Sequence, residues 1–533
     1  MENVTVIVIL LFGIAFLGLL SNRYKFPFPI VLVLSGVVIS VIPGLPVIAL
    51  SPDIVFVIFL PPLLYHAAWH TSWHDFKAAK RPIILAAIGL VLFTTLAVAV
   101  VAHVLIDDLS WPLAFLIGAI VSPPDAVAAT SITKGLGLQP RLLTVLDGES
   151  LVNDASGLVA YKYALAAITA GNFVLWEAGL NFFVVAGAGV AIGLAMGYIM
   201  YLIHKKFVCD PIVEVTFTFL TPFASYLFAE HFHFSGVLAV VSTGLYLSFR
   251  SNEIFTHQSR VMTVTVWDVV AYILNGLIFI LIGLQLRQIM EGIGDYSTAS
   301  LILWGAAISF VVIIVRFLWV VPATMLPRYF SKRIRLTEAF DKRNLVIFGW
   351  AGMRGVVSMA AALAIPLALP DGSAFPHRNL IIYLTFCVIL ATLIPLGLTL
   401  PWIIRKLKMQ RYSIFAEEYE VRNTIVSETI AHIEENYSLL QDELLNNIKS
   451  KYEVKFNRLQ KTELPAHFFG NGAPLSTNIF NEYTQLQIDL LNVERKKIDE
   501  MHRSGKANEE VLRKIERELD LEETRLNMDM YDG

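Results

Sequence analysis

The chain is dominated by long apolar stretches that recur from residue 3 to residue 404. A helix that crosses the hydrocarbon core of a bilayer needs about 20 mostly apolar residues. With that length as the unit, the sequence predicts thirteen spans, at residues 3–20, 27–42, 52–67, 82–105, 111–132, 142–170, 173–203, 211–230, 234–249, 261–288, 297–325, 342–369 and 378–404. The chain is therefore expected to be an all-α polytopic membrane protein.

The composition excludes several other classes of protein. Hydrophobic residues make up 56% of the chain and charged residues 16%, whereas a soluble protein carries about 25% charged residues. The first apolar run opens with Glu2 and lacks a charged leader and a cleavage site, so it is expected to be a retained span. A net charge of −3 argues against a nucleic-acid partner. The sequence contains no P-loop, zinc-ligand spacing or nucleophile elbow, so it predicts neither a cofactor nor an enzyme.

The distribution of lysine and arginine predicts the orientation, because these residues favour cytosolic loops. If the N-terminus lies outside, seventeen of them fall in inside loops and two, Arg287 and Arg378, in outside loops. The inside set is Arg23, Lys25, Lys77, Lys80, Arg81, Lys134, Arg141, Lys205, Lys206, Arg250, Arg260, Arg328, Lys332, Arg333, Arg335, Lys342 and Arg343. We therefore expect a multi-pass protein of the cell membrane with a cytosolic C-terminus.

The last part of the chain, residues 408–533, is polar and contains no further span. Apolar residues at helical spacing form two stripes there. The stripes are Leu439, Leu440, Leu444, Leu445 and Ile448, and Leu512, Ile515, Leu519 and Leu526. A Gly- and Pro-containing break at residues 467–478 separates them. Two interpretations fit this pattern: a cytosolic helical domain with a regulatory role, and loosely ordered amphipathic helices.

The odd number of spans suggests two six-helix repeats within residues 1–407, at about 1–170 and 211–407, joined by a linker helix at about 173–203. An offset of seven spans gives the repeats opposite orientations, as in inverted-repeat transporters. Corresponding spans of the two repeats are interrupted. The fifth span contains Pro123 and Pro124, which break its hydrogen-bond ladder, and the twelfth contains three closely spaced glycines. One charge, Asp125 or Arg354, lies beside each break.

The sixth span contains the densest group of polar residues, DGESLVNDASG. Ser150 lies four residues before Asp154, and Glu149 lies four before Asn153, so each pair shares a helix face. Carboxylate, hydroxyl and amide oxygens, with carbonyls freed by the proline break, suit a small alkali cation. Charge at this depth is costly, so it marks function or a buried partner.

Asp154 is expected to bind a proton and a cation in turn, because desolvation disfavours the charged form of a carboxylate. Competition between the two ligands is what an antiporter requires. The alternative is that Asp154 is a hydrogen-bonded packing residue and that Asp125 caps a half-helix. For Arg354 and Glu149 we expect a structural ion pair with each other. Lys162 is expected to pair with an internal acid or to extend to the interface.

Four blocks carry a family resemblance: VSPPDAVAAT, DGESLVNDASGLV, NGLIFILIGLQL and GMRGVVSMAAALAIP. Together they resemble the sodium/proton antiporters of the NhaP/NHE branch of the cation:proton antiporters, over roughly residues 5–405. The resemblance implies thirteen spans, discontinuous crossing helices, a homodimer, and a six-helix core that moves against a dimerisation domain. It also implies that Na⁺ and H⁺ are the transported ligands.

The resemblance assigns roles residue by residue. It places the cation- and proton-binding aspartate at Asp154 and the aspartate of the first unwound helix at Asp125, with the Pro124 carbonyl and the Ser150 hydroxyl as further ligands. Asn153 takes the place of a second aspartate found in electrogenic relatives, which implies electroneutral exchange. The family's stabilising ion pair falls on Glu149 and Arg354.

One position departs from the family pattern. His66, in the third span, stands where many relatives carry an acid, so it is either a pH-responsive gate or a neutral hydrogen-bonding group. Asp268 and Asn275, seven residues apart in the tenth span, share a face and are expected at the core interface. Two other functions stay open: a K⁺/H⁺ antiporter of the same mechanism, and an ion channel or membrane sensor.

Overall fold

The computed structural model describes residues 2–42, 55–133, 136–170, 175–207, 210–293, 296–330, 342–407, 414–436, 452, 477–504 and 507–531. The chain divides into two compact units, which are treated separately below. The membrane unit comprises residues 1–206, 216–250 and 266–411, and the tail unit comprises residues 207–215, 251–265 and 412–533.

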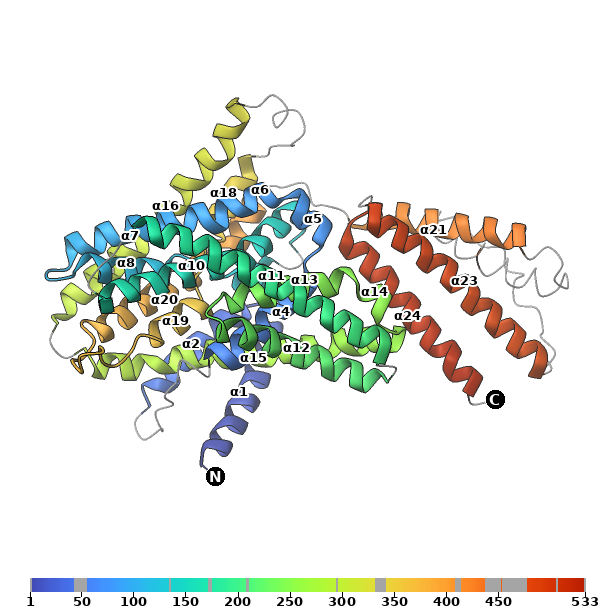
Figure 1. Cartoon of the computed structure of the whole chain (residues 1–533), viewed down its shortest axis with the longest axis horizontal. Helices are drawn as coiled ribbons and strands as arrows, with labels where there is room; N and C mark the ends of the chain where they lie inside the picture. Colours follow the sequence, from blue (N-terminus) through green and yellow to red (C-terminus); the bar gives the residue numbers. More distant parts are fainter. Residues whose placement is uncertain are drawn as a thin grey trace. The chain divides into compact units, whose positions relative to one another are not determined.

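The first half of the membrane unit is a succession of helices (Figure 1). They are α1 (Glu2–Tyr24), α2 (Phe28–Ser40), the π-helix η1 (Val55–Phe59), α4 (Leu60–His70), α5 (Trp73–Ala78), α6 (Lys80–Ile84), the π-helix η2 (Leu85–Leu90), α7 (Val91–Leu105), α8 (Trp111–Val121), α9 (Ala126–Thr133), α10 (Pro140–Ala170) and α11 (Leu175–Phe207).

The second half continues in the same way. It contains α12 (Pro211–His231), α13 (Gly236–Phe249), α15 (His257–Glu291), α16 (Thr298–Phe330), α18 (Lys342–Trp350), α19 (Val356–Leu363) and α20 (Arg378–Lys406), and the first residues of α12 and α15 belong to the tail unit. Each predicted span coincides with helical residues of the described chain. The all-α prediction is confirmed, whereas the count of thirteen membrane crossings and the inverted repeats stay predictions.

Seven helices in the described part of the chain are long and apolar enough to cross a membrane. They are Thr5–Tyr24, Lys80–Leu105, Asn181–Phe207, Pro211–His231, Gln258–Glu291, Thr298–Met325 and Arg378–Lys406. Helix α10 is long enough but carries several charged residues, and the helices on either side of the two breaks are short. These helices are relevant to function, because the binding sites of membrane transporters lie at discontinuous helices.

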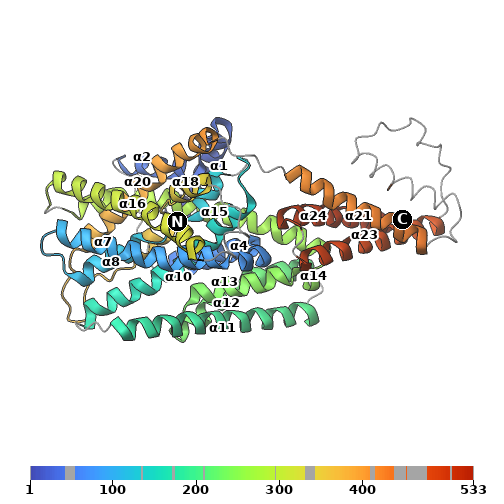
Figure 2. The ribbon, with the colours of Figure 1, turned by 90° about the horizontal axis from the view of Figure 1, so that it is seen from above.

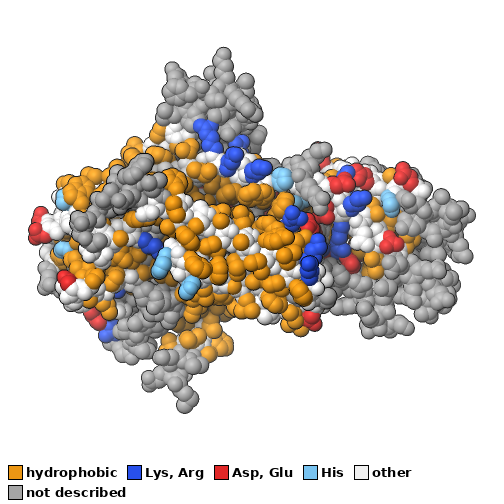
Figure 3. All heavy atoms as spheres, in the orientation of Figure 1, with side chains coloured by type: hydrophobic (Ala, Val, Ile, Leu, Met, Phe, Trp, Pro, Cys, Tyr) orange, Lys and Arg blue, Asp and Glu red, His pale blue; other side chains and the backbone are white. Residues whose placement is uncertain are grey.

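The surface of the membrane unit is apolar. Large hydrophobic side chains such as Phe12, Phe16, Phe183 and Phe310 are well over half exposed. Figure 3 shows hydrophobic side chains covering most of the visible face of these helices. Exposure of so large an apolar surface to water is unfavourable, so we interpret this surface as the one that contacts lipid.

The centre of the membrane unit is a close-packed helical core. Helix α8 packs against α7 and α10, α16 packs against α20, and α4 packs against α13. Figures 1 and 2 both show α7 and α8 running side by side. Close approach of backbones is possible at Gly118, where an added Cβ would meet the backbone of Thr95. This packing holds the two broken spans in place.

The tail unit is a helical assembly with its own core. Helices α21 (Ile414–Asn436), α23 (Thr477–Ser504) and α24 (Glu509–Tyr531) pack on one another. The predicted stripe Leu512, Ile515, Leu519 and Leu526 is buried there. The other predicted stripe, Leu439 to Ile448, and almost all of the predicted break at 467–478 lie outside the described residues.

The tail unit also includes short segments that precede membrane helices. These are residues 207–215 and residues 251–265, the latter containing α14 (Ser251–Ile254). Arg260 is held there by Asp520, with its Nε and Nη2 atoms 3.0 and 2.6 Å from the carboxylate oxygens, and Glu516 lies 3.6 Å away. The tail unit therefore combines residues 412–533 with these two segments, and the functional division at residues 407 and 408 stays a prediction.

Candidate functional site

The site forms where two broken helices meet. Helix α8 ends at Val121 and α9 begins at Ala126, while α18 ends at Trp350 and α19 begins at Val356. The two interruptions touch, since the Asp125 N–H donates to the carbonyl of Met353 at 2.7 Å. The breaks predicted from the proline pair and the glycine triplet thus lie side by side in space.

Asp125 occupies the positive ends of two half-helices. Its Oδ1 accepts a hydrogen bond from the N–H of Val127 at 2.9 Å, which caps the start of α9. Its Oδ2 lies against Gly355, the residue before α19, so closely that an added Cβ would clash with it. Helix N-termini stabilise negative charge. Oδ2 is buried and accepts no hydrogen bond of standard geometry from the described residues.

Two arginines occupy the negative ends of the other half-helices. The Nε of Arg354 donates to the carbonyl of Val121, the last residue of α8, at 2.7 Å. The Nε of Arg316 donates to the carbonyl of Phe348, near the end of α18, at 3.0 Å. Both arginines are buried. Cations at these positions offset the partial negative charge of helix C-termini, so they stabilise the interruption of two helices inside the membrane.

The structure corrects the expected pairing of Glu149. Its two carboxylate oxygens accept from Arg316, at 2.7 and 2.8 Å, in a bidentate pair that is almost fully buried. Arg354 instead bonds to the carbonyls of Val121 and Gly352, and its Nη2 has no hydrogen-bond partner among the described residues. The expectation of an ion pair between Glu149 and Arg354 therefore names the right acid and the wrong arginine.

Asn153 ties α10 to the first break. Its Nδ2 donates to the carbonyl of Pro124 at 2.8 Å, and both residues are buried. The amide oxygen of Asn153 is buried and has no hydrogen-bond partner among the described residues. Asn153 therefore occupies one acceptor position of the Pro124 carbonyl, and unlike Pro124 it is not among the residues that line the cavity described next.

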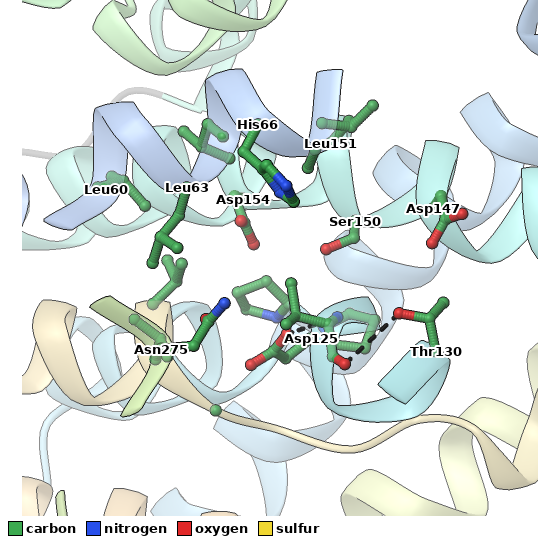
Figure 4. A pocket seen from close by; sticks show the side chains of 18 of the residues that line it. Leu60, Leu63, His66, Asp125, Thr130, Asp147, Ser150, Leu151, Asp154 and Asn275 are labelled. Atoms are coloured by element: carbon green, nitrogen blue, oxygen red, sulfur yellow. Dashed lines mark hydrogen bonds between the residues drawn. The ribbon is translucent and has the colours of Figure 1, made fainter. Parts of the chain in front are cut away.

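Asp154 and Ser150 face a cavity of about 260 Å³ (Figure 4). Figure 4 shows Asp154, Ser150 and His66 on one side of it and Asp125, Thr130 and Asn275 on the other. Asp154 is only 7% exposed, and its carboxylate makes no hydrogen bond or ion pair with any described residue. The sequence-predicted residues Asp154, Asp125, Ser150 and Pro124 all line this one cavity.

Sequence reasoning missed three residues of the site. Asp147 lines the cavity one turn before Ser150 on α10, and Thr130 lines it from α9. The spacing of residues 147, 150 and 154 places all three on one helix face, which was a usable signal. Arg316 was signalled by being a lone charge within the apolar run of α16.

His66 has an acidic neighbour. Its Nε2 lies 3.4 Å from Oδ1 of Asp268 on α15, and the Nε2 of His70 lies 3.8 Å from the same oxygen. His66 and His70 both line the cavity, as does Asn275. His66 is therefore a hydrogen-bonding group at the cavity wall, while gating and pH modulation by it stay predictions.

Lys162, on α10, pairs with Glu230 on α12, their Nζ and Oε2 atoms being 3.0 Å apart. The expected alternatives were an internal acid and extension to the interface, and the partner is an acid near the end of α12, with the two side chains 51% and 31% exposed. Glu230 also accepts from the N–H of Gly236. The pair therefore links α10 with the turn between α12 and α13.

Comparison with known proteins identifies the class. Residues 7–406 match the family described as "Sodium/hydrogen exchanger, transmembrane". An uncharacterized Na⁺/H⁺ exchanger of Mycobacterium tuberculosis is 29% identical over 98% of this chain and 96% of its own length. The "sodium, potassium, lithium and rubidium/H⁺ antiporter" of Bacillus subtilis is 31% identical over 75% of this chain and 61% of its own.

A solved structure agrees in fold. The sodium proton antiporter MjNhaP1 of Methanocaldococcus jannaschii matches with a TM-score of 0.57 and 20% identity, over 76% of this chain and 99% of its own. The family that the chain matches is one of membrane transporters and not of enzymes. The chain belongs to the sodium/hydrogen exchanger family, and it is a monovalent cation/proton antiporter.

Proposed function

We propose that the protein exchanges Na⁺, and also Li⁺, for H⁺ by alternating access, with Asp154 as the shared binding group. Asp125, Ser150 and Asn153 assist it, together with the Pro124 carbonyl. No cofactor takes part, and the cation and the proton are the transported ligands.

One observation carries this proposal: two carboxylates and a hydroxyl face one cavity, and the carboxylate that is almost fully buried has no protein partner. Asp154, Asp125 and Ser150 line the cavity, Asp154 is 7% exposed, and its carboxylate forms no hydrogen bond or ion pair with the described residues. A buried polar atom without a hydrogen-bond partner costs about 1–3 kcal/mol of stability, and a bound ligand would offset that cost. Oxygen donors without nitrogen or sulfur suit a hard alkali cation.

The two aspartates explain the competition between cation and proton. Asp125 and Asp154 line the same cavity, and their negative charges repel each other. A bound Na⁺ or a bound proton on Asp154 relieves that repulsion. Neutralisation by either ligand also lowers the cost of moving the site past an apolar barrier, which couples the exchange of one for the other.

The stoichiometry we propose is one cation for one proton. Asn153 is an amide whose Nδ2 donates to Pro124, so it supplies an oxygen without a proton-binding charge. Asp154 then carries both ligands in turn. Asp125 is held at two helix N-termini, and we assign it a positioning role beside Asp154 instead of a second exchangeable proton.

The architecture we propose is that of the sequence analysis. Thirteen spans form two inverted repeats, at about 1–170 and 211–407, with a linker helix at about 173–203. The N-terminus lies outside the cell membrane, and residues 408–533 lie in the cytosol in a regulatory role. The protein is a homodimer. We assign it a role in pH homeostasis, because exchange of a cation for H⁺ changes the pH on both sides of the membrane.

Potassium is the second candidate cation. The B. subtilis relative is named for sodium, potassium, lithium and rubidium, and its identity to this chain is 31%. Oxygen ligands serve both Na⁺ and K⁺, and discrimination depends on cavity size and ligand number. The same residues would then perform K⁺/H⁺ exchange by the same mechanism.

Transport by purified protein in liposomes tests the proposal. We expect Na⁺ or Li⁺ gradients to move protons, with saturation and reversal, and with K⁺ giving a smaller rate. Asp154→Asn should reduce exchange to the level of empty liposomes. Asp107→Asn, which removes an exposed acid outside the cavity, is the matched control. Exchange that persists in Asp154→Asn refutes the assignment, and a larger rate with K⁺ selects the potassium alternative.

A further inference from the structure

A cluster of two histidines and one carboxylate lies at the wall of the ion cavity. His66 and His70 come from α4, and Asp268 comes from α15. One ligand atom from each of the three residues lies within 4.8 Å of the other two. The shortest separation is 3.4 Å, from Nε2 of His66 to Oδ1 of Asp268.

The helix geometry presents both imidazoles to the same side. His66 and His70 are four residues apart, so their side chains lie one above the other on the helix face. Their ring centroids are 4.5 Å apart at an interplanar angle of 63°. The side chains of His66, His70 and Asp268 are 24%, 40% and 57% exposed, so water and dissolved ions reach them.

The donor set differs from that of the sodium site. Two imidazole nitrogens and one carboxylate oxygen are preferred ligands of divalent first-row transition metals, and they leave a coordination position for water. Tetrahedral Zn²⁺ with ligands at 2.0–2.2 Å places neighbouring ligand atoms about 3.3 Å apart. The observed separations of 3.4 and 3.8 Å to Oδ1 of Asp268 are already close to that value.

We propose that His66, His70 and Asp268 bind a divalent transition-metal cation of the Zn²⁺ class, and that the bound cation inhibits exchange. The inhibitory part rests on the proposed function, whereas the metal site stands on its own geometry.

Inhibition follows from the position of the cluster. His66 and His70 line the same cavity as Asp154 and Asp125. A divalent cation held at that wall repels a monovalent cation that enters the cavity, and it fills part of a space of only about 260 Å³. It also ties α4 to α15 at this point. Entry to the transport site is therefore slowed from the side on which the cluster lies.

Binding by the purified full-length protein, with any affinity tag removed, tests the site directly. We expect one Zn²⁺ per chain by calorimetry, and visible absorption typical of four-coordinate cobalt when Co²⁺ is the probe. Mg²⁺ should not compete, because it prefers oxygen ligands. Binding should weaken from pH 7.5 to pH 6, because the imidazoles must be neutral to bind metal.

Matched variants locate the site. His70→Gln and Asp268→Asn should each weaken Zn²⁺ binding by about 100-fold or more, since loss of even an outer-shell partner costs 10–100-fold. His231→Gln removes an exposed histidine outside the cavity and should leave binding unchanged. Absence of saturable binding, or equal binding by His70→Gln, overturns the metal site.

Transport in liposomes tests the inhibition, with each variant compared with its own metal-free rate. Zn²⁺ at saturating concentration should slow exchange by wild type and by His231→Gln about tenfold or more, and should not slow His70→Gln. Binding without slowed exchange overturns the inhibitory role. If wild type binds Zn²⁺ but exchanges no cation without it, the proposed function fails while the metal site holds.

Discussion

Helix α10 carries two groups of buried polar residues about one turn apart, and the two groups are satisfied in opposite ways. Glu149 forms a bidentate pair with Arg316, in which both oxygens accept hydrogen bonds. Asp154 makes no hydrogen bond or ion pair with the described residues, and Oδ1 of Asn153 has no hydrogen-bond partner there. Both groups are removed from bulk water, so burial alone does not distinguish them.

The difference separates a buried acid that is held by a protein partner from one that is open to a ligand. A carboxylate that is paired on both oxygens cannot release its partner without a large penalty, so Glu149 holds a charge fixed. A carboxylate at a cavity without a protein partner exchanges ligands at low cost. The occupied pair also orders the scaffold, because Arg316 bonds to the end of α18. The paired Glu149 therefore stabilises the helices around Asp154, about one turn further along α10, whose carboxylate has no protein partner.

The largest expected effect comes from breaking the occupied pair. Arg316→Ala leaves Glu149 buried without its partner and should destabilise the protein by about 3–5 kcal/mol. We expect poor accumulation and a much lower unfolding temperature in detergent, followed by intrinsic fluorescence. The uncharged double replacement Glu149→Gln with Arg316→Met should recover much of that loss, since no charge is then left unpaired. Wild-type stability of Arg316→Ala would show that the pair does not hold the scaffold.

A smaller effect is expected where the two breaks touch. In Gly355→Ala the added Cβ would clash with Oδ2 of Asp125, so the carboxylate must move from the start of α19. A misplacement of about 1 Å at a reactive group can cost 100-fold, and we expect a 10- to 100-fold loss of exchange in a folded protein. Gly187→Ala is the control, because an added Cβ there meets nothing within 4 Å. Equal rates for the two variants would contradict this account.

Asn153→Asp sharpens the comparison by adding an acid beside Asp154. An ionised carboxylate cannot donate to the Pro124 carbonyl, so one hydrogen bond is lost at a cost of about 1–3 kcal/mol. If a single carboxylate makes exchange electroneutral, the second one should bind an additional proton and make the rate depend on membrane potential. The exchange rate of the variant and of wild type, measured in liposomes with and without a potassium-diffusion potential, tests this expectation. An unchanged, voltage-independent rate would remove Asn153 from the explanation of stoichiometry.

The sequence predicted much of this arrangement, for reasons that can be named. Apolar length located the helices, and the proline pair located the first break. The four-residue spacing on α10 placed Ser150 and Asp154 on one face, and both line the cavity. These signals are local, since each depends on residues within a few turns of one helix.

The partners across the fold were not predictable in the same way. Arg316 lies 167 residues from Glu149, and Asp268 lies 202 residues from His66. Arg316 and Arg354 are both buried cations close to a helix break, and only the three-dimensional fold decides which of them reaches Glu149. The expected partner, Arg354, instead bonds to the carbonyl of Val121 at the end of α8.

The smallest effect is expected in the tail unit, where charges are paired but closer to water. The hydrogen bond that Nε2 of His502 donates to Oε1 of Glu509, 3.0 Å away, raises the pKa of His502. Its stabilisation is therefore fully present below the ordinary histidine pKa of about 6.5 and is lost as the pH rises through the raised value. The contribution is about 1 kcal/mol or less, as for other partly exposed pairs.

Hydrogen exchange of α23 and α24 in the full-length protein, corrected for intrinsic rates, should show more protection at pH 6 than at pH 8. His502→Gln should remove that difference and His231→Gln should keep it, whereas equal protection at both pH values in wild type would mean that this pair contributes nothing to holding the tail unit together.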